Sequence, residues 1–165
     1  KELLDKARKV GAIIYYDVNF RSTHANEAIK LMPTILENFE YADIVRGSTE
    51  DFGNMFDMTD ADKVYQHKVS FYCPRFICTN GGEGLCLRTK NLTKDYPVEP
   101  LQTVSTIGAG DNFNAGLVLR KSNTAFSITG SNAIFADLMV NCKHMRSCIC
   151  TRVVSVGDDL SSKSI

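Results

Sequence analysis

The stretch that decides the fold is residues 106–116, which read Thr-Ile-Gly-Ala-Gly-Asp-Asn-Phe-Asn-Ala-Gly. Its small residues at 108–110 would leave the backbone N–H groups of a helix start uncovered, and Phe113 and Leu117, four residues apart, would anchor that helix to a core. A helix start has unpaired N–H donors and a partial positive charge, so it binds anions, phosphate especially. Asp111 lies in the first turn beside this pocket and could accept a proton from a substrate hydroxyl. The alternative is that Asp111 only caps the helix and the glycines only make a tight turn.

Two common phosphate-binding motifs do not fit this stretch. The chain contains no Gly-x-x-x-x-Gly-Lys-Ser/Thr sequence, which excludes a P-loop. A dinucleotide fingerprint needs a third small residue where Phe113 stands, and an acidic residue about 20 positions further on at a strand end. Neither requirement is met, so a dinucleotide site is excluded as well.

The hydrophobic pattern around this stretch predicts strands that alternate with helices. A continuous β-rich run predicts a strand at 12–16, and two further short strands are expected at 42–45 and 76–79. A glycine-rich turn at 81–84 predicts a hairpin with a strand at 85–87. Helical spacing and capping residues predict helices at 1–9, 26–39, 48–56, 60–66, 108–121 and 128–145, and residues 91–102 read as a loop with short extended pieces. This alternation predicts an α/β fold with a mainly parallel sheet flanked by helices.

Composition excludes several classes of partner. The 165 residues are 44% hydrophobic and carry 19 basic and 19 acidic side chains, so bulk positive charge cannot drive binding to nucleic acid or to a membrane surface. No apolar run reaches the roughly 18 residues of a membrane span, and residues 1–9 do not resemble a signal peptide. The six cysteines form no Cys-x-x-Cys pair of the kind that zinc sites use. Because no secretory signal is seen, we expect reduced thiols and a cytoplasmic location.

Four segments together resemble the ribokinase-like, or pfkB-type, carbohydrate kinases. Residues 106–116 are similar to that family's second signature almost position for position, with Asn112 where Thr is usual. Residues 17–21, Asp-Val-Asn-Phe-Arg, resemble the D-x-N-x-R strand end of the fructokinase-like members, and residues 79–84 match the T-x-G-x-x-G turn on the nucleotide side. Residues 42–48 resemble the strand that leads into the family's N-x-x-E motif.

The resemblance implies an ATP-dependent sugar kinase that transfers the γ-phosphate to a sugar hydroxyl. Asp111 would be the general base, and the N–H groups of Gly108, Ala109, Gly110 and Asp111 would form an anion hole for the transferring phosphate. A fructose-like hexose is the first expected substrate, and a kinase of vitamins or nucleosides is an alternative within the same fold.

The same resemblance assigns further residues to ATP, to Mg²⁺ and to the substrate. The nucleotide-binding positions would be Thr79, Gly81, Gly84 and Thr106, and the substrate or phosphate positions would be Asp17, Asn19 and Arg21. If Ser48 takes the place of the motif's Asn, Asp51 takes that of its Glu and would organise Mg²⁺ through water, with Glu50 as the competing candidate. A simple acidic helix start is the alternative for both carboxylates. The resemblance also implies a monovalent cation near the anion pocket.

The resemblance covers only the C-terminal half of such a kinase. We therefore expect residues 1–165 to be the nucleotide-binding and catalytic part of a ribokinase-like domain, without its N-terminal strands and its β lid. Lids in this family often pair across a dimer, so a homodimer is a further expectation. Because a site without a lid leaves the reaction open to water, a non-catalytic nucleotide-binding or interaction module is the alternative function.

Overall fold

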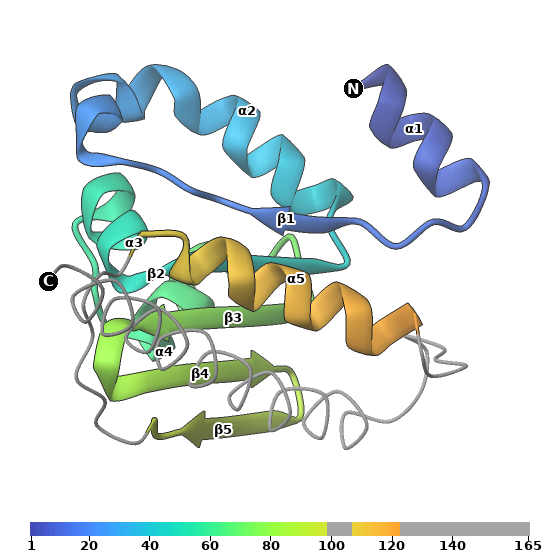
Figure 1. The fold of residues 1–165 in the computed structure, drawn as a ribbon. Helices are drawn as coiled ribbons and strands as arrows, with labels where there is room; N and C mark the ends of the chain where they lie inside the picture. The colour runs from blue at the N-terminus through green and yellow to red at the C-terminus, as the bar shows by residue number, and fades with distance from the viewer. Residues whose placement is uncertain (99–106, 123–165) are drawn as a thin grey trace, which may run out of the picture. The chain divides into compact units, whose positions relative to one another are not determined.

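The computed structural model describes residues 1–98 and 107–122, and its strands form one mixed sheet in the order β1-β2-β3-β4-β5 (Figure 1). β1, β2 and β3 run parallel to one another, whereas β4 runs antiparallel to β3. The strand bounds are β1 Tyr15–Asp17, β2 Ile44–Ser48, β3 Arg75–Asn80, β4 Gly84–Thr89 and β5 Leu92–Tyr96. The chain divides into two units, Lys1–Asp95 and Tyr96–Ile165.

The central parallel strands, β2 and β3, are buried on both faces of the sheet, whereas β1 is half-buried. In β2 the first four residues are all buried, including Ile44 and Val45, whose side chains point to opposite faces of the sheet. The register pairs Tyr15 with Ile44 and Val45 with Phe76. The strand predicted at 42–45 is therefore confirmed, although it begins at Ile44 and extends to Ser48.

Helices and helical turns cover one face of the sheet in the first unit. They are α2 (Ala28–Tyr41), α3 (Thr49–Phe56), α4 (Ala61–Val64) and the π-helical turn η2 (Tyr65–Val69). Their apolar sides meet the sheet in one core, in which Phe39 of α2, Phe52 of α3, Val64 of α4 and Phe76 of β3 are fully buried. The helix α1 (Glu2–Lys9) and the 3₁₀ turn η1 (Ser22–Glu27) have no buried residue. This packing of helices on a mainly parallel sheet confirms the predicted α/β fold.

Arg88 of β4 fixes α4 and β5 to the sheet. Its Nε donates to Asp62 Oδ1 of α4 at 2.7 Å, and its Nη1 donates to Asp95 Oδ1 of β5 at 2.6 Å. The Arg88 side chain is almost completely buried, and such a charge is retained only where carboxylates pair with it. The same hydrogen bond from Arg88 lowers the pKa of Asp95.

Several element boundaries differ from the sequence prediction. Helix α2 begins at Ala28 rather than at residue 26, because residues 22–27 form the 3₁₀ turn η1. The helix predicted at 60–66 is one α-helical turn followed by the π-helical turn. Residues 92–96, predicted within a loop, form the strand β5 because they pair at the sheet's edge, where exposed polar side chains are tolerated. The helix predicted at 128–145 lies outside the described residues.

The second unit contains the helix α5, Ala109–Ser122. Phe113 and Leu117 of this helix are buried, as their spacing predicted. Gly108, directly before the helix, has a φ of +76°, a left-handed conformation that favours glycine. The helix predicted at 108–121 is therefore confirmed, one residue later in the chain, and Gly108 turns the backbone into it.

Candidate active site

The carboxyl ends of the three parallel strands bring the predicted substrate and nucleotide residues to one edge of the sheet. Asp17 is the last residue of β1, Ser48 the last of β2 and Thr79 the last but one of β3. The register places Asp17 beside Arg46 and Ser48 beside Thr79. This is the edge at which open α/β sheets bind their ligands.

Arg46 of β2 joins two of these residues in one buried group. Its Nη1 donates to both carboxylate oxygens of Asp17 at 3.0 Å, and its Nη2 donates to Thr79 Oγ1 at 2.9 Å. Arg46 is 6% exposed and Thr79 is 2% exposed, so these contacts form in a low-dielectric environment. Asp17 and Thr79, which the resemblance assigned to different ligands, thus share one guanidinium.

Sequence reasoning missed Arg46. The signal was present, because an arginine that directly follows Ile44 and Val45 in a buried strand needs an acidic partner. The sequence does not identify that partner, since Asp17 lies 29 residues earlier in the chain.

A glycine turn follows Thr79 and Asn80 at the end of β3. Gly81 has a φ of +46° and Gly84 a φ of +125°, so both occupy backbone conformations that side chains disfavour. The turn is a 3₁₀ turn, η3 (Gly81–Glu83), and its two flanking strands pair antiparallel. The predicted hairpin is confirmed, and Gly81 is exposed whereas Gly84 is buried.

The acidic start of α3 is organised around Ser48. Asp51 Oδ2 accepts hydrogen bonds from Ser48 N at 2.7 Å and from Ser48 Oγ at 2.6 Å, while Ser48 Oγ accepts from Asp51 N at 3.1 Å. This reciprocal pair is a capping box, which confirms Ser48 as the N-cap. Asp51 is 8% exposed, whereas Glu50 is exposed.

A hollow of about 480 Å³ lies next to this helix start. Its lining includes Thr49 and Glu50 from the start of α3 and Asn80 from the end of β3. Thr49 Oγ1 donates to Asn80 Oδ1 at 3.1 Å, and this hydrogen bond links α3 to β3 beside the hollow. Among the described residues, no three histidine, cysteine or acidic side chains are grouped closely enough to hold a metal ion by themselves.

The remaining substrate-side residues follow β1. Asn19 has a φ of +42°, which is uncommon for a residue with a side chain, and Arg21 is exposed directly before η1. The chain is anchored between them by Phe20, which is buried and whose carbonyl oxygen accepts from Asn54 Nδ2 at 3.3 Å.

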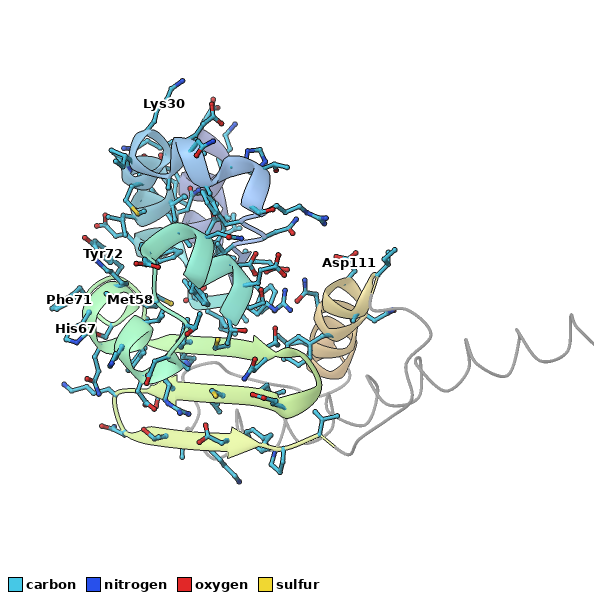
Figure 2. All side chains as sticks on the ribbon, turned by 90° about the vertical axis from the view of Figure 1, so that its left-hand side faces the viewer. Lys30, Met58, His67, Phe71, Tyr72 and Asp111 are labelled. Carbon is cyan, nitrogen blue, oxygen red and sulfur yellow. The ribbon has the colours of Figure 1, made fainter. Side chains whose placement is uncertain are left out.

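The predicted base and anion hole belong to the second unit. Asp111 is exposed in the first turn of α5 (Figure 2). Asn112 N donates to Gly108 O at 2.9 Å, which closes the first helical turn. The N–H groups that precede such a first bond have no acceptor within the helix and can bind an anion. Thr106 lies outside the described residues.

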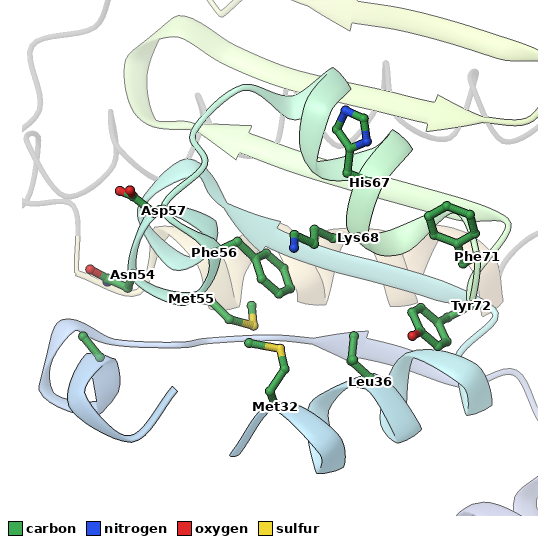
Figure 3. Close-up of a pocket in the computed structure, with 12 residues that line it drawn as sticks. Met32, Leu36, Asn54, Met55, Phe56, Asp57, His67, Lys68, Phe71 and Tyr72 are labelled. Carbon is green, nitrogen blue, oxygen red and sulfur yellow. The ribbon is translucent and has the colours of Figure 1, made fainter. Parts of the chain in front are cut away.

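A larger groove of about 870 Å³ lies in the first unit, between α2 on one side and α3 and η2 on the other (Figure 3). Its walls include Met32 and Leu36 of α2, Phe56 of α3, and Phe71 and Tyr72 after η2. None of the residues that the sequence assigned to ATP, Mg²⁺ or substrate lines this groove.

Comparisons with known proteins identify relatives of this chain. Residues 1–126 match the family described as pfkB family carbohydrate kinase. A fructokinase from Rhizobium leguminosarum bv. trifolii is 30% identical over 116 residues, which are 70% of this chain and 35% of that protein.

Within the described part of the chain, no helix has both the length and the apolar character needed to cross a membrane.

Two solved structures share the fold. The aminoimidazole riboside kinase from Salmonella enterica, in complex with aminoimidazole riboside and an ATP analog, superposes with a TM-score of 0.73 at 23% identity, covering 86% of this chain and 47% of that one. The fructokinase from Vibrio cholerae O395, in its form bound to fructose, ADP and calcium ion, gives a TM-score of 0.72 at 21% identity, covering 88% and 45%. The chain therefore spans about a third of the matched curated relative and less than half of these two solved chains.

Proposed function

The chain belongs to the pfkB family of carbohydrate kinases, and from this premise we propose that it carries the nucleotide-binding and catalytic half of an ATP-dependent sugar kinase. The observation that carries the proposal is the start of α5, where Gly108 in a left-handed conformation precedes a helix whose first turn exposes Asp111. One catalytic carboxylate, Asp111, is sufficient in this proposal, because phosphoryl transfer depends mainly on positioning and electrostatic stabilisation.

In this proposal Asp111 accepts the proton of the attacking sugar hydroxyl. The oxygen then forms its bond to the γ-phosphorus as the bond from that phosphorus to the β-phosphate oxygen breaks, leaving ADP. The N–H groups of Gly108, Ala109, Gly110 and Asp111 stabilise the charge on the transferring phosphoryl group. Glycine and alanine suit these positions because a larger side chain would obstruct the phosphate.

Thr79, Gly81 and Gly84 form the nucleotide side of the proposed site, together with Thr106. Support comes from the glycine backbone angles of the turn and from its place at the carboxyl end of β3. Mg²⁺ bound with ATP would supply positive charge between the phosphates. Asp51 would act on it through its second oxygen, Oδ1, and through water, because Oδ2 already accepts two hydrogen bonds from Ser48.

Fructose or a similar hexose is the proposed substrate, with Asp17, Asn19 and Arg21 on the substrate side. Support comes from the related fructokinase and from the fructose-bound solved neighbour. The riboside bound by the other neighbour keeps a nucleoside substrate as an alternative. A monovalent cation near the anion pocket, a cytoplasmic location and a homodimer remain predictions of the resemblance.

A non-catalytic nucleotide-binding module is the second candidate. One observation favours it: Asp17 and Thr79, predicted to contact ligands, direct their side-chain oxygens to Arg46. In such a module the helix start of α5 would still bind a phosphate, but no sugar would be phosphorylated.

The test compares the chain with its Asp111→Asn variant in two assays. The first measures ADP production from Mg·ATP with a pool of sugars, and the second measures Mg·ATP affinity by calorimetry. Turnover that Asp111→Asn reduces by at least about 10²-fold, with affinity retained, would support a kinase with Asp111 as base. Affinity without turnover in either protein would support the binding module, and the absence of both would refute the proposal for this chain.

A further inference from the structure

One guanidinium contacts the first residue of both strand-end segments of the proposed site. Asp17 opens the segment 17–21 on the substrate side, and Thr79 opens the segment 79–84 on the nucleotide side. Arg46 can reach both because β2 lies between β1 and β3 in the sheet. Its two terminal nitrogens divide the contacts, Nη1 to Asp17 and Nη2 to Thr79.

The contacts are short and shielded from solvent. The Asp17 side chain is 22% exposed and the Arg46 side chain 8% exposed, with N–O distances of 2.9–3.0 Å to the two partners. A guanidinium is planar, so fixing one of its nitrogens on Asp17 also fixes the direction of the other toward Thr79. Removing one partner of a buried pair leaves a charge without compensation, so these contacts are costly to break.

We propose that Arg46 is a positioning residue for the reaction, which holds Asp17 and Thr79 at a fixed separation and so couples the substrate-side segment to the nucleotide-side turn. Its effect on catalysis rests on the proposed function. The link between the segments 17–21 and 79–84 depends only on the folded sheet, so it can be measured without enzymatic turnover.

Arg88 is the matched control, because it is a buried arginine whose role is structural only. It is also nearly fully buried on the same sheet, and it also bridges two elements through Asp62 and Asp95. Its partners belong to neither strand-end segment. Replacing either arginine by lysine keeps the positive charge but removes the planar fork.

The first experiment is hydrogen exchange followed by mass spectrometry on the 165-residue chain and its Arg46→Lys and Arg88→Lys variants. Thermal unfolding of each protein gives the global stability against which local exchange is compared. In Arg46→Lys we expect the amides of 17–21 and 79–84 to exchange about tenfold faster, beyond any global change, because a buried hydrogen bond is lost in each segment. Arg88→Lys should leave both segments unchanged relative to global stability. Unchanged exchange in either segment of Arg46→Lys, or equal changes in both variants, would overturn the proposal.

The second experiment measures kinetics with Mg·ATP and fructose on the same proteins. Arg46→Lys should raise the KM for ATP and the KM for fructose together by about tenfold each, while Arg88→Lys changes neither. Thr79→Val, which removes one acceptor and keeps the side-chain shape, should raise the KM for ATP more than that for fructose. An inactive parent chain with the expected exchange pattern would refute the kinase proposal and leave the coupling supported. An active parent whose KM values are unaffected by Arg46→Lys would overturn the positioning role.

Discussion

Replacing Gly47 by alanine should destabilise the first unit, because the core has no room for one added methyl group. A Cβ atom at residue 47 would stand 2.5 Å from Cζ and 2.8 Å from Cε2 of Phe52, well inside the roughly 3.5–4.0 Å of a normal carbon contact. The Phe52 ring cannot swing into solvent, because it is fully buried and lies 5.2 Å, centroid to centroid, from Phe76. Phe56 stacks at 6.4 Å from the same ring. Overpacking of this kind costs about 1–3 kcal/mol.

Urea unfolding and thermal unfolding of Gly47→Ala would measure this cost, at about 2–4 °C of Tm per kcal/mol for a chain of this size. Gly82→Ala is the control, since a Cβ there meets nothing within 4 Å, and we expect a change within about 0.5 kcal/mol. Phe52→Leu in the Gly47→Ala background should relieve the contact, so the double variant should lose less stability than the two single variants added together. A Gly47→Ala protein as stable as Gly82→Ala would refute this reasoning, as would strictly additive losses.

Three further predictions follow from the hydrogen bonds and burial described above. Ser48→Ala removes half of the capping box with Asp51 and should lower the free energy of unfolding by about 1 kcal/mol in urea; an unchanged midpoint would contradict the capping role. Because the hydrogen bond from Arg88 lowers the pKa of Asp95, this carboxylate contributes stability that is complete above its unfolded pKa of about 3.9 and is lost as the pH falls through its lower folded value. Asp95→Asn should therefore flatten the acid-unfolding curve below about pH 4, and a curve identical to the parent's would count against the pairing. Burial raises the pKa of the Cys78 thiol to about 12, so peptide mass spectrometry should find it unalkylated by iodoacetamide at about pH 8 until the chain unfolds, whereas rapid native labelling would show that it is accessible.

The sequence was sufficient for features that local pattern determines. The local pattern predicted a strand at 42–45, where β2 begins, the glycines of 81–84 predicted the hairpin, and the small residues before Asp111 predicted the helix start. Each of these features depends on residues within one short segment. Ser48 as the N-cap of α3 is of the same kind, because a capping box spans only four residues.

The sequence was insufficient where partners lie far apart in the chain. The polar segment 92–96 became a strand only because β4 offers it an edge to pair with. Arg46 was missed because its role depends on Asp17 and Thr79, which are 29 and 33 residues away. The proposed ligand roles of the strand-end residues depend on a resemblance and stay predictions until binding is measured.

The mixed direction of the sheet also determines the order in which it can assemble. β3 and β4 are joined by the three residues of η3, so their pairing closes a very short loop, and hairpins of this kind form within about 1–10 μs. The pairing of β1 with β2 instead needs the closure of a loop with the intervening α2, which carries a greater entropic cost before any contact compensates for it. We therefore expect the β3–β4 hairpin to form first during folding. The Arg46 bridge, which needs all three parallel strands, is completed late, so its contacts should govern how slowly the first unit unfolds more than how fast it folds.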